Sequence, residues 1–402
     1  MVVGCYDGSI HGWTLDITKN SSLDSLEETL TVNNFKLSFS YTSHEGCIKA
    51  LAIQDFSQSQ QPLTSERKRK RRRKGKVKAN TYLVSGGTDE TIKVYSLTQQ
   101  KNEEYGEITE HTNTITSLAF LGDQQEALLS GCEDGKILLW RTYDWNEIAE
   151  FKGHKSGSVT NLVVHPNNQL FFSTSRDNSL RLWDATTSKA ASRNKLEKCK
   201  VVQDVVWSYD GQNYAVLCDD HIVMVFDVNN SEAKPFFLLT MKERIASISF
   251  LSCSNEENSK QVKNLLLALE NGILEVFELS QSEVDETKEH KPLISCDLFT
   301  SSKEEVEDEN LQRMRIRHMK SVSLQLKHPV SSTEKKKTEN GFMTDMVRVD
   351  LVFLTLSTKK VSAVYLYKDL KENTISLKIM KDQLQVRSHA HITSLCTGVL
   401  DA

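Results

Sequence analysis

The sequence predicts an all-β fold in which seven small sheets form a ring, a seven-bladed β-propeller. Three observations carry this prediction: a repeat with a period of 43 residues, a constant turn pattern inside the repeat, and a first blade whose missing strand stands at the other end of the chain. Repeats of about 40–45 residues with three or four short strands are typical of propeller blades.

Two adjacent segments show the repeat most clearly. One is HTNTITSLAFLGDQQEALLSGCEDGKILLWRT, from His111, and the other is HKSGSVTNLVVHPNNQLFFSTSRDNSLRLWDA, from His154. Each contains a His, an alternating apolar run, a polar turn, a second apolar run, a turn Asp and a third run that ends in Trp. Alternation of apolar and polar residues predicts half-buried strands.

The turn pattern recurs in five units. A turn Asp precedes a strand aromatic by six residues, and in three units a Ser stands four residues before the Asp: Ser85, Ser130 and Ser173. The Asp–aromatic pairs are Asp7–Trp13, Asp89–Tyr95, Asp134–Trp140, Asp177–Trp183 and Asp220–Phe226. Constant spacing predicts equivalent positions in successive blades.

The chain begins inside a blade. Val2–Cys5, Ile10–Leu15 and Leu37–Tyr41 predict its second, third and outer strands, and His391–Leu400 supplies the first. A ring closed in this way leaves fewer exposed sheet edges. Six further units complete seven blades in a single domain over residues 1–402, and the later ones keep the strand pattern but lose the His. They span 44–108, 111–152, 154–198, 199–242, 243–300 and 314–382.

Three segments do not fit strands and are expected to be surface loops: 54–79, 301–313 and 327–345. The first contains a basic cassette of ten Lys and Arg: Arg67, Lys68, Arg69, Lys70, Arg71, Arg72, Arg73, Lys74, Lys76 and Lys78. Without these ten, the chain has 40 Lys and Arg against 54 Asp and Glu. Like charges with nothing apolar to bury cannot form a core, so a disordered loop is expected.

Three interpretations of the basic cassette remain open. It can be a nuclear or nucleolar address, a contact to the phosphates of pre-ribosomal RNA, or a solvated run without a role. Clustered positive charge gives salt-sensitive, sequence-independent affinity for nucleic acid. The cassette has no interleaved aromatic residue, so base-specific recognition is not expected.

Composition excludes several classes. The eight cysteines stand singly without a CxxC pair, which favours reduced thiols in an intracellular protein over a zinc site or a disulfide framework. His389 and His391 lack a third ligand nearby in sequence, so neither a metal nor another cofactor is expected. No apolar run is long enough for a transmembrane helix, and the first residues do not resemble a secretory signal.

The sequence LRLWD at Leu180–Asp184, preceded by Gly153-His154, resembles the WD-repeat family. In that family the His, Ser, Asp and Trp of a unit form a hydrogen-bonded chain. The resemblance implies three such sets: His44, Ser85, Asp89 and Tyr95; His111, Ser130, Asp134 and Trp140; His154, Ser173, Asp177 and Trp183.

These sets invite a second interpretation as a hydrolase triad. They recur in several units, which one active site does not require, and no GxSxG elbow is present. We therefore expect structural roles, because hydrogen bonds make it possible to bury Asp and indole N–H groups. No catalytic residue, no enzymatic activity and no small-molecule substrate are expected.

Longer stretches, VVGCYDGSIHGW at the start and VSGGTDETIKVYSL at Val84–Leu97 among them, resemble the p21-activated-kinase-interacting WD proteins. That resemblance implies a scaffold for assembly of the large ribosomal subunit in the nucleus and nucleolus. It also implies ribosomal proteins and assembly factors of the large-subunit precursor as partners. Pre-ribosomal RNA and p21-activated kinase are further partners that it allows, and no membrane is expected.

Two other binding roles compete with ribosome assembly: a signalling scaffold that restrains p21-activated kinase, and a substrate receptor of a ubiquitin ligase. Many such receptors carry Trp-Asp-x-Arg, whereas here Trp183-Asp184 is followed by Ala185-Thr186. By analogy with other propellers, partner contacts are expected at the residue before each turn Asp. These residues are Tyr6, Thr88, Glu133, Arg176 and Asp219.

Overall fold

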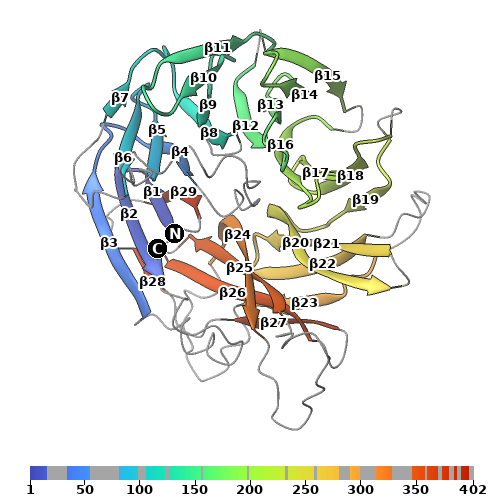
Figure 1. The fold of residues 1–402 in the computed structure, drawn as a ribbon. Helices are drawn as coiled ribbons and strands as arrows, with labels where there is room; N and C mark the ends of the chain where they lie inside the picture. The colour runs from blue at the N-terminus through green and yellow to red at the C-terminus, as the bar shows by residue number, and fades with distance from the viewer. Residues whose placement is uncertain are drawn as a thin grey trace, which may run out of the picture.

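The computed structural model is a ring of seven antiparallel sheets around a central axis (Figure 1). It describes residues 1–15, 34–54, 81–97, 106–122, 126–154, 157–196, 199–230, 234–257, 260–279, 290–298, 314–327, 346–357, 360–369, 374–379, 384–386 and 391–397. The predicted all-β propeller is confirmed. Within these ranges no helix is long and apolar enough to cross a membrane. The basic cassette, 301–313 and 328–345 lie outside the described residues.

The closing blade joins the two ends of the chain. It contains β29 (Ile392–Cys396), β1 (Val2–Cys5), β2 (Ser9–Leu15) and β3 (Phe35–Thr42), in that order. The β29 strand pairs antiparallel with β1, with Val2 opposite Cys396 and Gly4 opposite Ser394. In Figure 1 the red β29 lies beside the blue β1. The strand exchange expected from the sequence is therefore present.

The first three of the other six blades follow in chain order, each with its inner strand first. Blade 1 contains β4 (Ile48–Ile53), β5 (Tyr82–Gly87), β6 (Ile92–Ser96) and β7 (Gly106–Ile108). Blade 2 contains β8 (Ile115–Leu121), β9 (Ala127–Cys132), β10 (Ile137–Arg141) and β11 (Glu147–Phe151). Blade 3 contains β12 (Val159–Val164), β13 (Leu170–Ser175), β14 (Ser179–Asp184) and β15 (Lys189–Lys195).

The remaining blades come from the second half of the chain. Blade 4 contains β16 (Val202–Trp207), β17 (Asn213–Cys218), β18 (Ile222–Asp227) and β19 (Phe237–Thr240). Blade 5 contains β20 (Ile245–Glu257), β21 (Lys260–Leu269), β22 (Ile273–Leu279) and β23 (Ile294–Asp297). Blade 6 contains β24 (Ile316–Lys327), β25 (Met346–Leu356), β26 (Lys360–Asp369), β27 (Thr374–Ile379) and β28 (Leu384–Gln385).

Blade 6 differs in detail from the sequence prediction. Its inner strand includes Lys327, which the sequence assigns to a loop, and its outer edge is split. The β27 strand pairs with residues 364–369 of β26, and β28 pairs with Lys360 and Val361. Because β26 is ten residues long, one short outer strand does not cover it.

The core lies between blades. In the described part of the chain the buried apolar side chains form clusters that each join two neighbouring blades. One cluster packs Phe151 of β11 against Phe171 and Trp183 of blade 3, and another packs Val3 and Trp13 of the closing blade against Phe353 of blade 6. The ring is thus held by the apolar faces of adjacent sheets, which is why all seven blades depend on closure.

Each inner strand carries the same irregularity. The register shifts after its first residue, for example between Ile115 and Ser117 and between Val202 and Asp204. Such bulges bend and twist a strand locally. The bulge re-aims the third residue of each inner strand, and these residues are Ala50, Ser117, Asn161, Asp204, Ser247, His318 and Ser394.

Candidate binding surfaces

Blade 3 contains a complete hydrogen-bonded set. The Ser173 hydroxyl accepts from the Trp183 indole N–H at 2.7 Å and lies 2.7 Å from Nε2 of His154. Since the hydroxyl proton then points to Nε2, Nδ1 carries the ring proton and donates to Asp177 at 3.2 Å. His154 is 1% exposed, and burial lowers its pKa against the opposing effect of Asp177. This set joins β13, β14, the turn between them and the segment that precedes the blade.

Blade 1 has the same arrangement at His44, Ser85 and Asp89. Nε2 of His44 lies 2.7 Å from the Ser85 hydroxyl, and Nδ1 lies 2.9 Å from the Asp89 carboxylate. Burial alone would raise the pKa of Asp89. The His44 ring and the hydrogen bonds from Glu45 N–H and the Thr91 hydroxyl outweigh burial and lower it. Tyr95, in the Trp position, is buried.

Blade 2 departs from the expected set. Ser130 binds His111 Nε2 at 2.6 Å and the Trp140 indole at 2.7 Å, but the buried Nδ1 of His111 has no partner among the described residues. Asp134 instead accepts from the Cys132 thiol at 2.7 Å and from the backbone N–H of Lys136. In blades 1 and 3 the turn Asp accepts from the hydroxyl of Thr91 or Ser179. In blade 2 Lys136 stands at that position, and the Cys132 thiol donates to Asp134 instead. Burial lowers the pKa of His111 to about 4 and raises that of Cys132 to about 12.

None of the three histidines can reach a substrate. His44, His111 and His154 are each 3% exposed or less, and their ring contacts are internal to a blade. A general base must come within hydrogen-bond distance of the proton it removes. In the described part of the chain, no group of three or more His, Cys, Asp or Glu could hold a metal ion. The geometry supports structural roles for these sets.

The five candidate partner residues occupy equivalent turns. The backbone N–H of each donates to a carbonyl just before the inner strand of the same blade, at 2.9–3.0 Å. These bonds place Tyr6, Thr88, Glu133, Arg176 and Asp219 on one rim of the ring, which we call the turn rim. It lies between the second and third strands of each blade.

Only part of the turn rim is free to bind a partner. Tyr6, Thr88, Glu133 and Arg176 are exposed, and Asp219 is partly buried. Thr88 accepts from the N–H of Cys47 at 3.0 Å, and Asp219 accepts from the N–H groups of Lys200 and Val201 at 3.1 and 2.8 Å. The sequence placed Asp219 with the others, but its carboxylate caps the start of blade 4.

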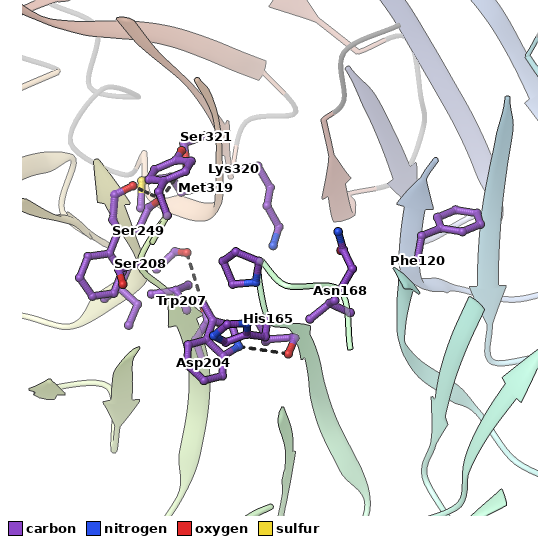
Figure 2. A pocket seen from close by; sticks show the side chains of 18 residues that line it. Phe120, His165, Asn168, Asp204, Trp207, Ser208, Ser249, Met319, Lys320 and Ser321 are labelled. Carbon is purple, nitrogen blue, oxygen red and sulfur yellow. Dashed lines mark hydrogen bonds between the residues drawn. The ribbon is translucent and has the colours of Figure 1, made fainter. Parts of the chain in front are cut away.

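A cavity of about 330 Å³ is lined by residues of five successive blades, from Phe120 of blade 2 to Ser321 of blade 6. Asp204 of β16 and Lys320 of β24 both line it, and Figure 2 shows their side chains projecting into the same space. Asp204 accepts from Asn161 at 2.7 Å and from the Val205 N–H at 2.9 Å, linking blades 3 and 4. Burial raises its pKa, and Lys320 opposes that shift. Sequence reasoning missed this cavity, which Asp204 and Ser247, the third residues of β16 and β20, help to line.

The fold and the hydrogen-bonded sets define the chain as a WD-repeat β-propeller protein. Residues 102–141 and 145–184 match the WD domain, G-beta repeat family. Within that class, the chain is similar to the p21-activated kinase-interacting WD-repeat proteins.

Three relatives illustrate the similarity. The p21-activated protein kinase-interacting protein 1-like of Gallus gallus is 34% identical over 43% of this chain and 44% of its own length. The Xenopus laevis protein of the same name is 28% identical over 63% of this chain and 57% of its own length. Protein MAK11 of Saccharomyces cerevisiae is 31% identical over 49% of this chain and 44% of its own length. The chain thus spans about half the length of the curated relatives it matches.

Proposed function

We propose that the chain is a non-enzymatic scaffold for assembly of the large ribosomal subunit in the nucleolus. The observation that carries the proposal is that the two strands flanking the basic cassette pair fully without it. The β4 and β5 strands pair from Ile53↔Leu83 to Ile48↔Gly87, so blade 1 is complete without the segment between them. A dense positive charge carried by an acidic propeller can meet RNA phosphates while the propeller contacts proteins.

The described residues on either side of that segment support two separate contact regions. The chain leaves β4 at the rim opposite the turn rim, because β4 and β5 are antiparallel and the turn rim lies at the other end of β5. Gln54 and Tyr82 mark the two ends of the gap, and Gln54 N–H donates to the Tyr82 carbonyl at 2.9 Å. A cassette anchored there leaves Tyr6, Glu133 and Arg176 open to protein partners.

A second function is regulation of p21-activated kinase. It is favoured by the similarity to proteins named for interaction with that kinase. The turn rim would then hold the kinase, and the protein would not need the nucleolus. The two functions therefore differ in where the protein resides and in what it sediments with.

The test is sedimentation of the tagged full chain through a sucrose gradient from cell extract. We expect it to travel with large-subunit precursors and to lose this association, and its nucleolar residence, when the ten basic residues of the cassette are changed to Ser. The matched control changes Lys335, Lys336 and Lys337 to Ser. Sedimentation only as free protein or with p21-activated kinase would reject ribosome assembly, and equal loss in the control would reject a specific role of the cassette.

A further inference from the structure

Two arginines face each other at the outer edge of blade 3. Arg181 of β14 is directly opposite Arg193 of β15 in the antiparallel register. Opposite residues in such a pair project from the same face of the sheet and lie close together. Two like charges at this position repel, so the pair lowers stability unless something else neutralises it.

Neither arginine forms an ion pair with an acidic residue among the described residues. Arg141, Arg244 and Arg315 lie 3.5, 3.4 and 3.3 Å from the carboxylates of Asp144, Asp220 and Glu270. Arg181 and Arg193 have no such ion pair in the described part of the chain. The buried Nε–H of Arg181 also has no hydrogen-bond acceptor there.

The field of the pair is felt inside the blade. Burial is the main cause of the lowered pKa of His154, and the charges of Arg181 and Arg193 lower it further. Burial and the charge of Arg193 also lower the pKa of Arg181. The charge of Asp177 opposes this lowering of the Arg181 pKa, but its carboxylate is already bonded to His154 and to the Ser179 hydroxyl at 2.6 Å.

The surroundings hold the partly buried Arg181 in position and leave Arg193 exposed. Residues 186–193, which include most of β15, are exposed, and this outer strand has small side chains at Ala190, Ala191 and Ser192. The guanidinium of Arg181 lies over Gly153, where a Cβ would come within 2.9 Å of Nη1. Gly153 therefore leaves room for Arg181 at the seam between blades 2 and 3.

We propose that Arg181 and Arg193 form an anion site that binds phosphate groups of RNA at the outer edge of blade 3. A single carboxylate has two oxygens and is satisfied by one guanidinium, whereas the nucleic-acid backbone offers successive phosphates to both. The site is separate from the basic cassette. Its choice of RNA rests on the proposed function, and its affinity for phosphate rests on the geometry alone.

The test measures binding of a fluorescently labelled single-stranded RNA oligonucleotide to the purified full chain by anisotropy, over a range of salt concentrations. Arg193→Glu should weaken binding about tenfold, and Arg181→Gln with Arg193→Gln should reduce the slope of log K against log salt by about 1.4. Arg244→Gln, which removes a paired arginine, is the control and should change neither. Both effects should persist when the cassette is changed to Ser.

Folding and ligand class are separated by two further measurements. Arg193→Glu creates an opposite-charge pair with Arg181, so its melting temperature should equal or exceed that of the parent while RNA binding falls. Unchanged RNA binding in both variants would overturn the site. Displacement of the RNA by polyglutamate as readily as by unlabelled RNA would overturn the choice of RNA in favour of an acidic protein segment. If the parent chain binds RNA through this site but does not associate with large-subunit precursors, the proposed function is rejected and the site is kept.

Discussion

Gly135 of blade 2 lies directly against the carbonyl oxygen of His154 at the start of blade 3. A Cβ at position 135 would stand 2.0 Å from that oxygen, and the glycine has a positive φ of 86°. Gly8 stands in the same relation to His44, at 2.1 Å. The turn of one blade therefore holds the first segment of the next, and only glycine fits at the contact.

Replacing Gly135 by Ala should lower the free energy of unfolding by about 2 kcal/mol or more, because it adds left-handed strain and a backbone clash. The matched control is Gly106→Ala in β7, where a Cβ would meet no atom within 4 Å and which should change stability by less than about 1 kcal/mol. Urea unfolding of both variants provides the measurement. Equal midpoints would show that the Gly135 contact does not constrain the ring.

Asp177 and Asp134 should differ in their contribution to stability. Asp177→Ala removes an acceptor from the buried His154 and should cost about 1–3 kcal/mol. Asp134→Ala should cost less, because no His111 bond is lost and the Cys132 thiol is a weak donor. The two substitutions are compared by denaturant midpoints. A cost for Asp134→Ala as large as that for Asp177→Ala would contradict this difference between the blades.

Stability should fall as pH drops from about 6.5 to about 4. The folded pKa values of His111 and His318 are about 4, below the ordinary value of 6.5. In that window the unfolded chain binds more protons, so each histidine costs up to about 3 kcal/mol by its lower end. Urea midpoints measured at several pH values provide the test, and His318→Gln should flatten the dependence.

The carboxylates act in a different pH range. The pKa values of Asp89 and Asp177 are lowered in the fold, so their stabilisation is present above about pH 4 and is lost below it. Loss of stability between pH 6.5 and 4 is therefore assigned to the histidines. An unchanged slope in the His318→Gln variant would show that this ring does not contribute.

Deleting residues 391–402 should destabilise the whole ring. Ile392 and Leu395 of β29 are 7% and 6% exposed and pack in the cluster shared with blade 6. Their loss alone corresponds to about 3–6 kcal/mol of apolar burial, and β1 also loses its partner strand. Leu395→Ala is a milder test and should cost about 2–5 kcal/mol. A truncated chain with the parental melting temperature would show that closure by β29 is dispensable.

The turn rim should bind protein partners through the exposed side chains that are not bonded to the backbone of their own blade. Changing Tyr6, Glu133 and Arg176 together to Ala should remove bound proteins from an affinity purification. Stability should change by about 0.5 kcal/mol or less at each site, as for surface changes in general. The control changes Tyr143, Glu147 and Lys189, an exposed aromatic, acid and base that lie by the turns to the outer strands, at the opposite rim. If the turn-rim variant recovers the same partners as the control variant, the turn rim is not the surface that binds them.

Much of the fold is predictable from the sequence because its signals are local. Alternating apolar residues define the strands, and the six-residue spacing from Asp177 to Trp183 places a turn and a strand in each repeat. The pairing of Val2–Cys5 with Ile392–Cys396 could be inferred because the six blades between them are complete and the first blade lacks one strand. In blade 6, Lys327 and the split outer strand were missed, since long strands there lack the turn residues that mark an end.

The seven-bladed ring, its closure and the residue types of the hydrogen-bonded sets could all be predicted from the amino-acid sequence. Which of those residues meet depends on how the blades fold and pack. Asp134 lies six residues before its strand Trp, as Asp177 does. Its carboxylate accepts from the Cys132 thiol, and His111 Nδ1 has no partner among the described residues. Likewise, Arg181 and Arg193 are twelve residues apart in the chain, and only the register of β14 and β15 sets them face to face. Hydrogen-bond competition and strand register depend on where neighbouring segments lie. The spacing of residues along one strand does not specify those positions.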